Sequence, residues 1–146
     1  TVTLAESCTG GMVASMLTTV PGSADAFLGG VVSYSNLVKH RALNVPTALL
    51  EGDDAPGAVS SETAIAMAEG ARKLADADFA LSITGVAGPA SSEGKPVGLV
   101  YIGLAERDKE TRVVQLQLSG DRQGIRIRAS KRALYMLWLA LTGRGE

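Results

Sequence analysis

The segment Ala5-Glu-Ser-Cys-Thr-Gly-Gly11 places a serine in a turn between an alternating apolar stretch and a helical pattern. Such a turn holds Ser7 at the carboxyl edge of a sheet, where backbone N–H groups converge. The neighbouring residues whose amides could stabilise an oxyanion or bind a phosphate, or whose small size admits a ligand, are Cys8, Thr9, Gly10 and Gly11. The turn therefore predicts a nucleophile or an anion site. The alternative is that Ser7 or Thr9 only caps the following helix.

A second glycine-rich loop, residues 85–98, follows alternating apolar residues that end at Thr84. The Thr84 hydroxyl and the N–H groups that follow it, starting with Gly85, would face Ser7 across the same sheet edge. This placement predicts binding of a carbonyl or a phosphate. The alternative is that these glycines serve only sharp turns.

Arg122 and Arg126 lie four residues apart near the predicted start of the last helix, so they share a face. Cations at a helix N-terminus oppose its dipole, and a bound anion would resolve that conflict. Because guanidinium groups match phosphate oxygens, we predict that these two arginines bind a nucleotide phosphate. The alternative, a solvated basic face, is kept for Arg128, Lys131 and Arg132.

Cys8 and His40 are the only residues of their kinds and raise a rival chemistry, in which a thiolate attacks and imidazole takes the proton. We disfavour it, because adjacent residues of a turn point in different directions and a lone cysteine is commonly buried and inert. One cysteine and one histidine cannot furnish a typical zinc site. We therefore expect no metal and no cofactor.

The positions of these residues depend on the elements around them. Alternating apolar residues predict strands at about 2–4, 28–34, 79–84, 97–105 and 111–118. Helical spacing and capping residues predict helices at 12–20, from Ser35 or Asn36 past Lys39, from Ser60 or Ser61 to about Ala75, and from near Asp121 to Gly143. Residues 46–58 are predicted to be a surface loop.

The last two predicted strands are joined by a connection short enough to require an antiparallel hairpin. Gln115 and Gln117 indicate that the strand at 111–118 has one solvent-exposed face, as expected for a strand at the edge of the sheet. Buried helix stripes are predicted at Ala64, Met67, Ala71 and Leu74, and at Ala133, Leu134, Leu137, Trp138 and Leu141. The fold class that follows is α/β, a three-layer α/β/α sandwich with a mixed, partly antiparallel sheet.

The composition of the 146 residues, with 46% hydrophobic and 20% charged, predicts a soluble single domain over residues 1–146. No apolar run is long enough to cross a membrane, and a net charge of -1 argues against nucleic-acid binding. A single cysteine and the lack of a secretory leader favour the cytoplasm. Because the chain opens on Thr1 rather than on Met, trimming of a leading segment or of a fused domain is left open.

Six short motifs follow one another along the chain: Ala5–Gly11, Val32-Ser-Tyr-Ser-Asn36 with Lys39, Val59-Ser-Ser-Glu-Thr63, Thr84-Gly-Val-Ala-Gly-Pro89, Lys95-Pro-Val-Gly98 and Gly120-Asp-Arg122. In these motifs the chain resembles the carboxyl-terminal domain of the competence/damage-inducible CinA family, whose stand-alone members are nicotinamide-nucleotide amidases. The resemblance covers nearly the whole chain. Ala90-Ser-Ser departs from it, because glycines are more usual there in the family.

The resemblance implies hydrolysis of the carboxamide of nicotinamide mononucleotide to the nicotinate nucleotide and ammonia, without a metal. It also implies Ser7 as nucleophile, with Tyr34 and Lys39 as its helpers. An unassisted serine is a poor nucleophile, so Lys39 would have to act as its base. For that, burial or nearby cations must lower the pKa of the Lys39 amine. Tyr34 would relay the proton or orient Lys39.

Two other classes of function are kept as alternatives. One is a non-catalytic nucleotide-binding or regulatory module of a larger protein, since in the resembling family this domain is often fused to another. The other is nucleic-acid binding through the basic last helix. This alternative is weaker, because aromatic residues are not interleaved with the basic ones and the chain has no net positive charge. The expected partner is a small-molecule nucleotide, and a homodimer is plausible.

Overall fold

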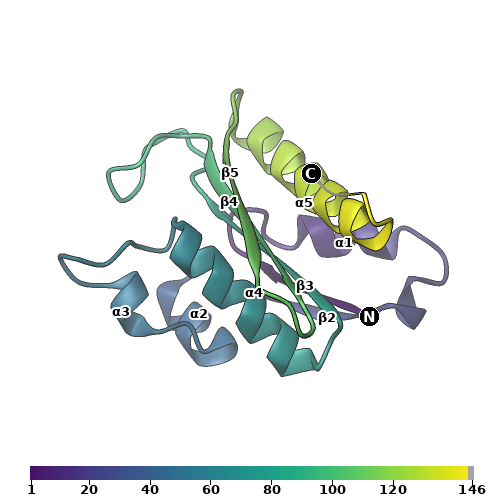
Figure 1. Ribbon diagram of the computed structural model, residues 1–146. Helices are drawn as coiled ribbons and strands as arrows, with labels where there is room; N and C mark the ends of the chain where they lie inside the picture. The colour runs from purple at the N-terminus through teal and green to yellow at the C-terminus, as the bar shows by residue number, and fades with distance from the viewer. Residues whose placement is uncertain (145–146) are drawn as a thin grey trace.

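The structure, a computed structural model, describes residues 1–144 (Figure 1). Residues 145 and 146, the last two of the predicted domain, lie outside the described residues. The strands are β1 Val2–Glu6, β2 Phe27–Val32, β3 Phe79–Gly85, β4 Leu99–Glu106 and β5 Arg112–Gln117. The helices are α1 Met12–Thr18, α2 Asn36–Leu43, α3 Thr47–Leu50, α4 Ser61–Ala75 and α5 Arg122–Leu141, with a 3-10 turn η1 at Ser23–Asp25.

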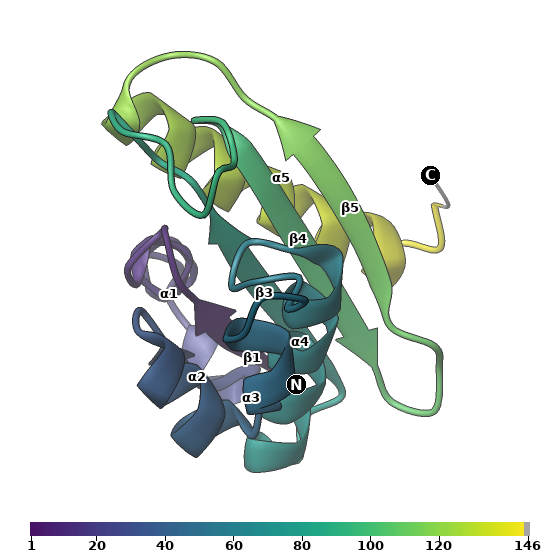
Figure 2. The ribbon, with the colours of Figure 1, turned by 90° about the vertical axis from the view of Figure 1, so that its left-hand side faces the viewer.

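The five strands form one sheet in the order β2-β1-β3-β4-β5. β1 runs parallel to both β2 and β3, whereas β3–β4 and β4–β5 are antiparallel. Figure 2 shows the long β4–β5 hairpin at one side of this sheet. The mixed sheet, the hairpin and the edge position of β5 are confirmed.

Helices cover both faces of the sheet, as Figure 1 shows. α1 and α5 pack on one face over a core of branched residues that includes Leu4, Leu81 and Ile102. On the other face lie α2, α3 and α4, and there small residues such as Ala5 and Ala80 let α4 pack close to the strands. The three-layer α/β/α sandwich is therefore confirmed.

Side-chain caps start three helices at the residues where the sequence predicted the helices to begin. The hydroxyl of Ser35 accepts the Val38 N–H and starts α2, and Ser60 does the same for α4. The Asp121 carboxylate accepts the Gly124 N–H at the start of α5. These caps determine where Lys39 and Arg122 emerge from their helices.

The structure corrects three predictions about the helices. Four residues of the predicted 46–58 loop form α3, because Leu50 is buried in the core beneath α4. The predicted stripe of α5 is right only in part: Ala133 and Leu137 are buried, but Trp138 is 43% exposed and Leu141 62% exposed, while Ile125, Ala129 and Met136 extend the buried face. Trp138 instead stacks on Tyr135 at 5.7 Å between ring centroids, and Leu74 of α4 is exposed as well.

None of the helices in residues 1–144 has the length and apolar character that a membrane span needs.

Candidate active site

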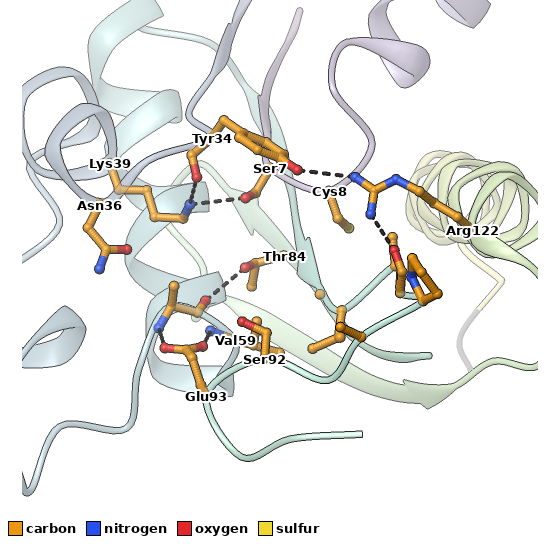
Figure 3. A pocket seen from close by; sticks show the side chains of 17 residues that line it. Ser7, Cys8, Tyr34, Asn36, Lys39, Val59, Thr84, Ser92, Glu93 and Arg122 are labelled. Carbon is orange, nitrogen blue, oxygen red and sulfur yellow. Dashed lines mark hydrogen bonds between the residues drawn. The ribbon is translucent and has the colours of Figure 1, made fainter. Parts of the chain in front are cut away.

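A pocket of about 480 Å³ opens at the edge of the sheet where β1 and β3 end (Figure 3). Its lining comes from five separate segments of the chain. The β1–α1 turn supplies Ser7, the β2–α2 region supplies Tyr34 and Lys39, and the end of β3 supplies Thr84. The glycine-rich loop continues the lining from Thr84 to Glu93, and Ala58 and Val59 before α4 and Arg122 at the start of α5 complete it.

Ser7 continues β1 by one residue, because its N–H donates to the Ile83 carbonyl of β3 at 2.9 Å. The chain then turns sharply, and the Gly10 N–H donates to the Ser7 carbonyl at 3.0 Å. Gly10 and Gly11 have φ angles of 58° and 100°, in the left-handed region that favours glycine. Ser7 therefore presents its side chain from a tight turn whose shape depends on these glycines.

The buried carboxylate of Glu6 holds the start of α1. It accepts the Thr9 hydroxyl at 2.7 Å and the N–H groups of Val13 and Ala14 at 2.9 and 3.0 Å. A carboxylate at a helix N-terminus is also favoured by the helix dipole. The Glu6 side chain, and not that of Ser7 or Thr9, thus accepts hydrogen bonds from the N–H groups in the first turn of α1. The Ser7 hydroxyl faces Lys39 instead.

Lys39 is only 1% exposed, and its amine points at Ser7. Its Nζ donates to the Ser33 carbonyl at 2.7 Å, to the Tyr34 carbonyl at 3.1 Å and to Ser7 Oγ at 3.0 Å. When the amine is neutral, its two N–H bonds can serve the two carbonyls. Its lone pair then faces the Ser7 hydroxyl, as a general base requires.

Burial lowers the pKa of Lys39 from its ordinary value to about 8, since a charged amine is poorly solvated there. The nearby Cys8 and Glu93 side chains act in the opposite direction and raise this pKa. The same burial raises the pKa of the Cys8 thiol to about 11, so the thiol is protonated at neutral pH. The rival chemistry with Cys8 as a thiolate nucleophile therefore gains no support, and His40 bonds the Val45 carbonyl away from the pocket.

Tyr34 contacts Lys39 through its backbone and Arg122 through its side chain. The Tyr34 carbonyl accepts from Lys39, while its hydroxyl accepts from Arg122 Nη2 at 3.2 Å. Arg122 also donates to the Gly88 carbonyl (Figure 3). The Tyr34 hydroxyl thus has a partner other than Lys39, and Arg122 lies at the far end of the pocket from the amine.

Arg126 does not line the pocket. Its guanidinium donates to the Cys8 and Thr9 carbonyls, both at 3.1 Å, and to the Gln123 side chain at 2.7 Å. The two predicted phosphate-binding arginines are therefore separated: Arg122 borders the pocket, and Arg126 braces the turn behind Ser7. Thr9, Gly10 and Gly11 belong to this turn and lie outside the lining as well.

Thr84 and Gly85 border the pocket as predicted, beside Ser7 and Cys8. The Thr84 hydroxyl donates its proton to the Ala58 carbonyl at 2.8 Å. A side chain at Gly85 would collide with Val100, because β4 passes close to that backbone. Both residues thus shape the wall of the pocket between Ser7 and the segment before α4.

Sequence reasoning missed three polar residues of the lining, Asn36, Ser92 and Glu93. Asn36 is part of the quoted Val32–Asn36 motif and was considered only as a helix cap. Glu93 lies inside a glycine-rich loop whose path no periodicity predicts. Its only sequence signal was a lone acid in a loop otherwise rich in Gly, Ser and Ala.

The sheet, the covering helices and the serine–lysine pair at the sheet edge define an α/β domain with a candidate active site at that edge. The chain matches the CinA C-terminal domain family over residues 1–141, and it belongs to that family. It is 52% identical over 128 residues to a competence-damage inducible protein of Desulforudis audaxviator, covering 87% of this chain and 30% of that one. A CinA-like protein of Geotalea uraniireducens is 50% identical over 140 residues, covering 95% of this chain and 32% of the relative.

Solved structures agree with this assignment. The competence/damage inducible protein CihA of Agrobacterium tumefaciens superposes with a TM-score of 0.89 at 40% identity, covering 97% of this chain and 84% of that one. The competence damage-inducible protein A of Klebsiella pneumoniae gives 0.90 at 33% identity, covering 97% and 86%. The chain spans about a third of the length of the curated relatives it matches.

Proposed function

We propose that this domain is a nicotinamide-nucleotide amidase, which hydrolyses the carboxamide of nicotinamide mononucleotide to the nicotinate nucleotide and ammonia. The observation that carries the proposal is the contact of 3.0 Å between Ser7 Oγ and the buried Lys39 amine. A serine nucleophile needs a base within hydrogen-bond reach, and a lysine can be that base only when its pKa is lowered. Both conditions are met at this pair.

In the first half of the reaction, Ser7 Oγ attacks the carboxamide carbon while its proton passes to the neutral Lys39 amine. The carbonyl electron pair moves onto oxygen and forms a tetrahedral oxyanion. As this intermediate collapses, the C–N bond breaks, and the leaving nitrogen takes the proton from Lys39 to become ammonia. Water then attacks the acyl-serine ester, passes a proton through Lys39 to Ser7, and releases the acid.

The oxyanion needs donors beside Ser7. The Gly10 N–H is already bonded to the Ser7 carbonyl, so we assign the oxyanion to the N–H of Cys8, the next residue in the pocket lining. Arg126 orients this peptide segment by binding the Cys8 carbonyl. Its role is thus to position the turn.

The remaining lining suits a nucleotide. The pocket volume lies within the range of small-ligand sites, and Val59, Val86 and Pro89 offer apolar contacts for a ring. Arg122 supplies a cation for the phosphate at the end remote from Lys39. The substrate would then span the pocket, with its carboxamide at Ser7 and its phosphate at Arg122.

An ammonia-release assay with nicotinamide mononucleotide and nicotinamide side by side tests the proposal. We expect release from both to depend on Ser7, with a clear preference for the phosphorylated compound. Tight binding of the mononucleotide without any ammonia would refute catalysis and favour the alternative, a non-catalytic nucleotide-binding module. A cytoplasmic location agrees with this role and is proposed with it.

A further inference from the structure

Glu93 is the only acid that lines the pocket among the residues the structure describes. Its side chain is 28% exposed, and both of its oxygens are bound to backbone. Oε2 accepts the Ala58 N–H at 2.8 Å, and Oε1 accepts the Val59 N–H at 2.9 Å. One carboxylate thus joins the 85–98 loop to the segment before α4 (Figure 3).

Lys95 completes this connection from the same loop. Its amine donates to the carbonyls of Pro56 and Val59 and lies 3.9 Å from Glu93 Oε1. Gly57, between the bound residues, has a φ of 93°, and a Cβ there would collide with the Glu93 carboxylate. The segment 56–59 is therefore shaped to receive Glu93 closely.

The same segment forms the pocket wall opposite Ser7 and Lys39. Ala58 and Val59 line the pocket, and the Ala58 carbonyl accepts the Thr84 hydroxyl from the end of β3. In Figure 3 Glu93 lies below this wall and Lys39 lies across the pocket from it. The carboxylate thus both holds the wall and places a negative charge opposite the buried amine.

We propose that Glu93 is a positioning residue for the Ser7–Lys39 pair, which fixes the 58–59 wall and supplies a negative charge that stabilises the Lys39 ammonium from across the pocket. The idea rests on the proposed function only for its catalytic consequence. The charge effect on Lys39 can be measured in the protein without substrate. The Glu93 charge raises the pKa of Lys39, because Coulomb attraction favours the charged form of the amine.

Other titratable groups around Lys39 do not replace Glu93. The Cys8 thiol is neutral because burial raises its pKa to about 11. Glu6 is bound by Thr9 and the α1 amides, and the Tyr34 hydroxyl is bound by Arg122. The titratable or charged groups in the lining besides Lys39 are Cys8, Tyr34, Glu93 and Arg122. Glu93 is therefore the lining group whose removal takes away a full negative charge.

The test follows the titration of Lys39 by NMR of protein labelled with ¹³C at the lysine ε-carbons. The chain has five lysines, and the Lys39→Met variant assigns the signal. In the wild-type protein we expect a midpoint near pH 8. In Glu93→Gln the midpoint should fall, because the amine loses a favourable charge.

Two matched variants separate charge from packing. Lys95→Gln breaks the same connection but removes a cation, so the Lys39 midpoint should stay or rise. Glu110→Gln removes an exposed acid on the β4–β5 hairpin and should leave the midpoint unchanged. An unchanged midpoint in Glu93→Gln, or equal falls in Glu93→Gln and Lys95→Gln, would overturn the proposal.

The kinetic arm uses ammonia release from nicotinamide mononucleotide. In Glu93→Gln, kcat/KM should fall by about tenfold or more because the wall loses its fixed position. The rising limb of its pH profile should also move to lower pH. If wild-type protein releases no ammonia while the NMR midpoint still falls in Glu93→Gln, the proposed function fails and the charge role of Glu93 stands.

Discussion

Lys39 Nζ lies 3.0 Å from Ser7 Oγ although 32 residues separate the two in the chain. The contact depends on parallel pairing of β1 with β2, which brings the ends of both strands to the same sheet edge. The Ser33 and Tyr34 carbonyls that follow β2 then aim the amine at the serine. The pair is thus a product of sheet topology together with two backbone oxygens.

The pH profile of ammonia release should report the protonation of Lys39. Because only the neutral amine can take the Ser7 proton, kcat/KM should rise about tenfold per pH unit below pH 8 and level off above it. The measurement is kcat/KM for nicotinamide mononucleotide from pH 6 to 9.5. A profile that is flat across this range would contradict the role of Lys39 as base.

The stability of the protein should also depend on pH through Lys39. Its folded pKa, about 8, lies below the ordinary value of 10.5, so the unfolded chain binds the extra proton between these two values. Relative to Lys39→Met, the wild type should therefore gain free energy of unfolding as pH rises from 8 to 10.5, by at most about 3 kcal/mol. Urea denaturation of both proteins at several pH values measures the difference. A difference that does not change with pH would contradict a buried, deprotonating amine.

Replacing Cys8 distinguishes the two possible nucleophiles. Cys8→Ala should retain most of the turnover, because burial keeps the thiol protonated and its backbone N–H, which we assign to the oxyanion, is unaffected. Steady-state ammonia release with nicotinamide mononucleotide measures this. Loss of activity in a correctly folded Cys8→Ala protein would revive the thiolate mechanism.

The two arginines should give different kinetic defects. Arg122→Met should raise KM for nicotinamide mononucleotide more than for its phosphate-free riboside, since Arg122 borders the pocket. Arg126→Met should lower kcat for both compounds alike, because Arg126 braces the turn that carries Ser7. Equal loss of phosphate preference in the two variants would contradict this division.

Glu6 should contribute mainly to stability. Glu6→Gln replaces a carboxylate that accepts three hydrogen bonds with an amide whose NH₂ group faces N–H donors. We expect a loss of about 2 kcal/mol in the free energy of unfolding. Glu110→Gln, at an exposed position, is the control and should change it little. A stable Glu6→Gln protein would show that α1 does not depend on this carboxylate.

The fold was largely predictable because its signals are local. Alternating residues mark the strands, and Ser35, Ser60 and Asp121 mark helix starts. Periodicity placed Ala133 and Leu137 of α5 in the core, but it did not show where the buried face ends, because apolar residues occur on two sides of that helix. Trp138 and Leu141 were therefore misplaced. Short α3 was missed because its four residues are too few to show a period.

The site was predictable as a set of segments and less so as a set of contacts. The turn at Ser7 and the ends of its neighbouring strands were found because parallel strands end at one edge. The two carbonyls that Arg126 binds lie 118 and 117 residues from it in the chain. Arg122, which binds the Tyr34 hydroxyl, lies 88 residues from Tyr34, so no local pattern reveals these contacts. Glu93 was missed for the same reason, since Ala58 and Val59 lie 35 and 34 residues before it.

Comparison of wild-type protein with Ser7→Ala at pH 8, with nicotinamide mononucleotide as substrate, tests serine-catalysed amide hydrolysis most directly. Ammonia release should fall by about a thousandfold or more in Ser7→Ala, as expected when a nucleophile is removed. Circular dichroism should show the same fold in both proteins. A Ser7→Ala protein that releases ammonia at the wild-type rate would contradict the mechanism.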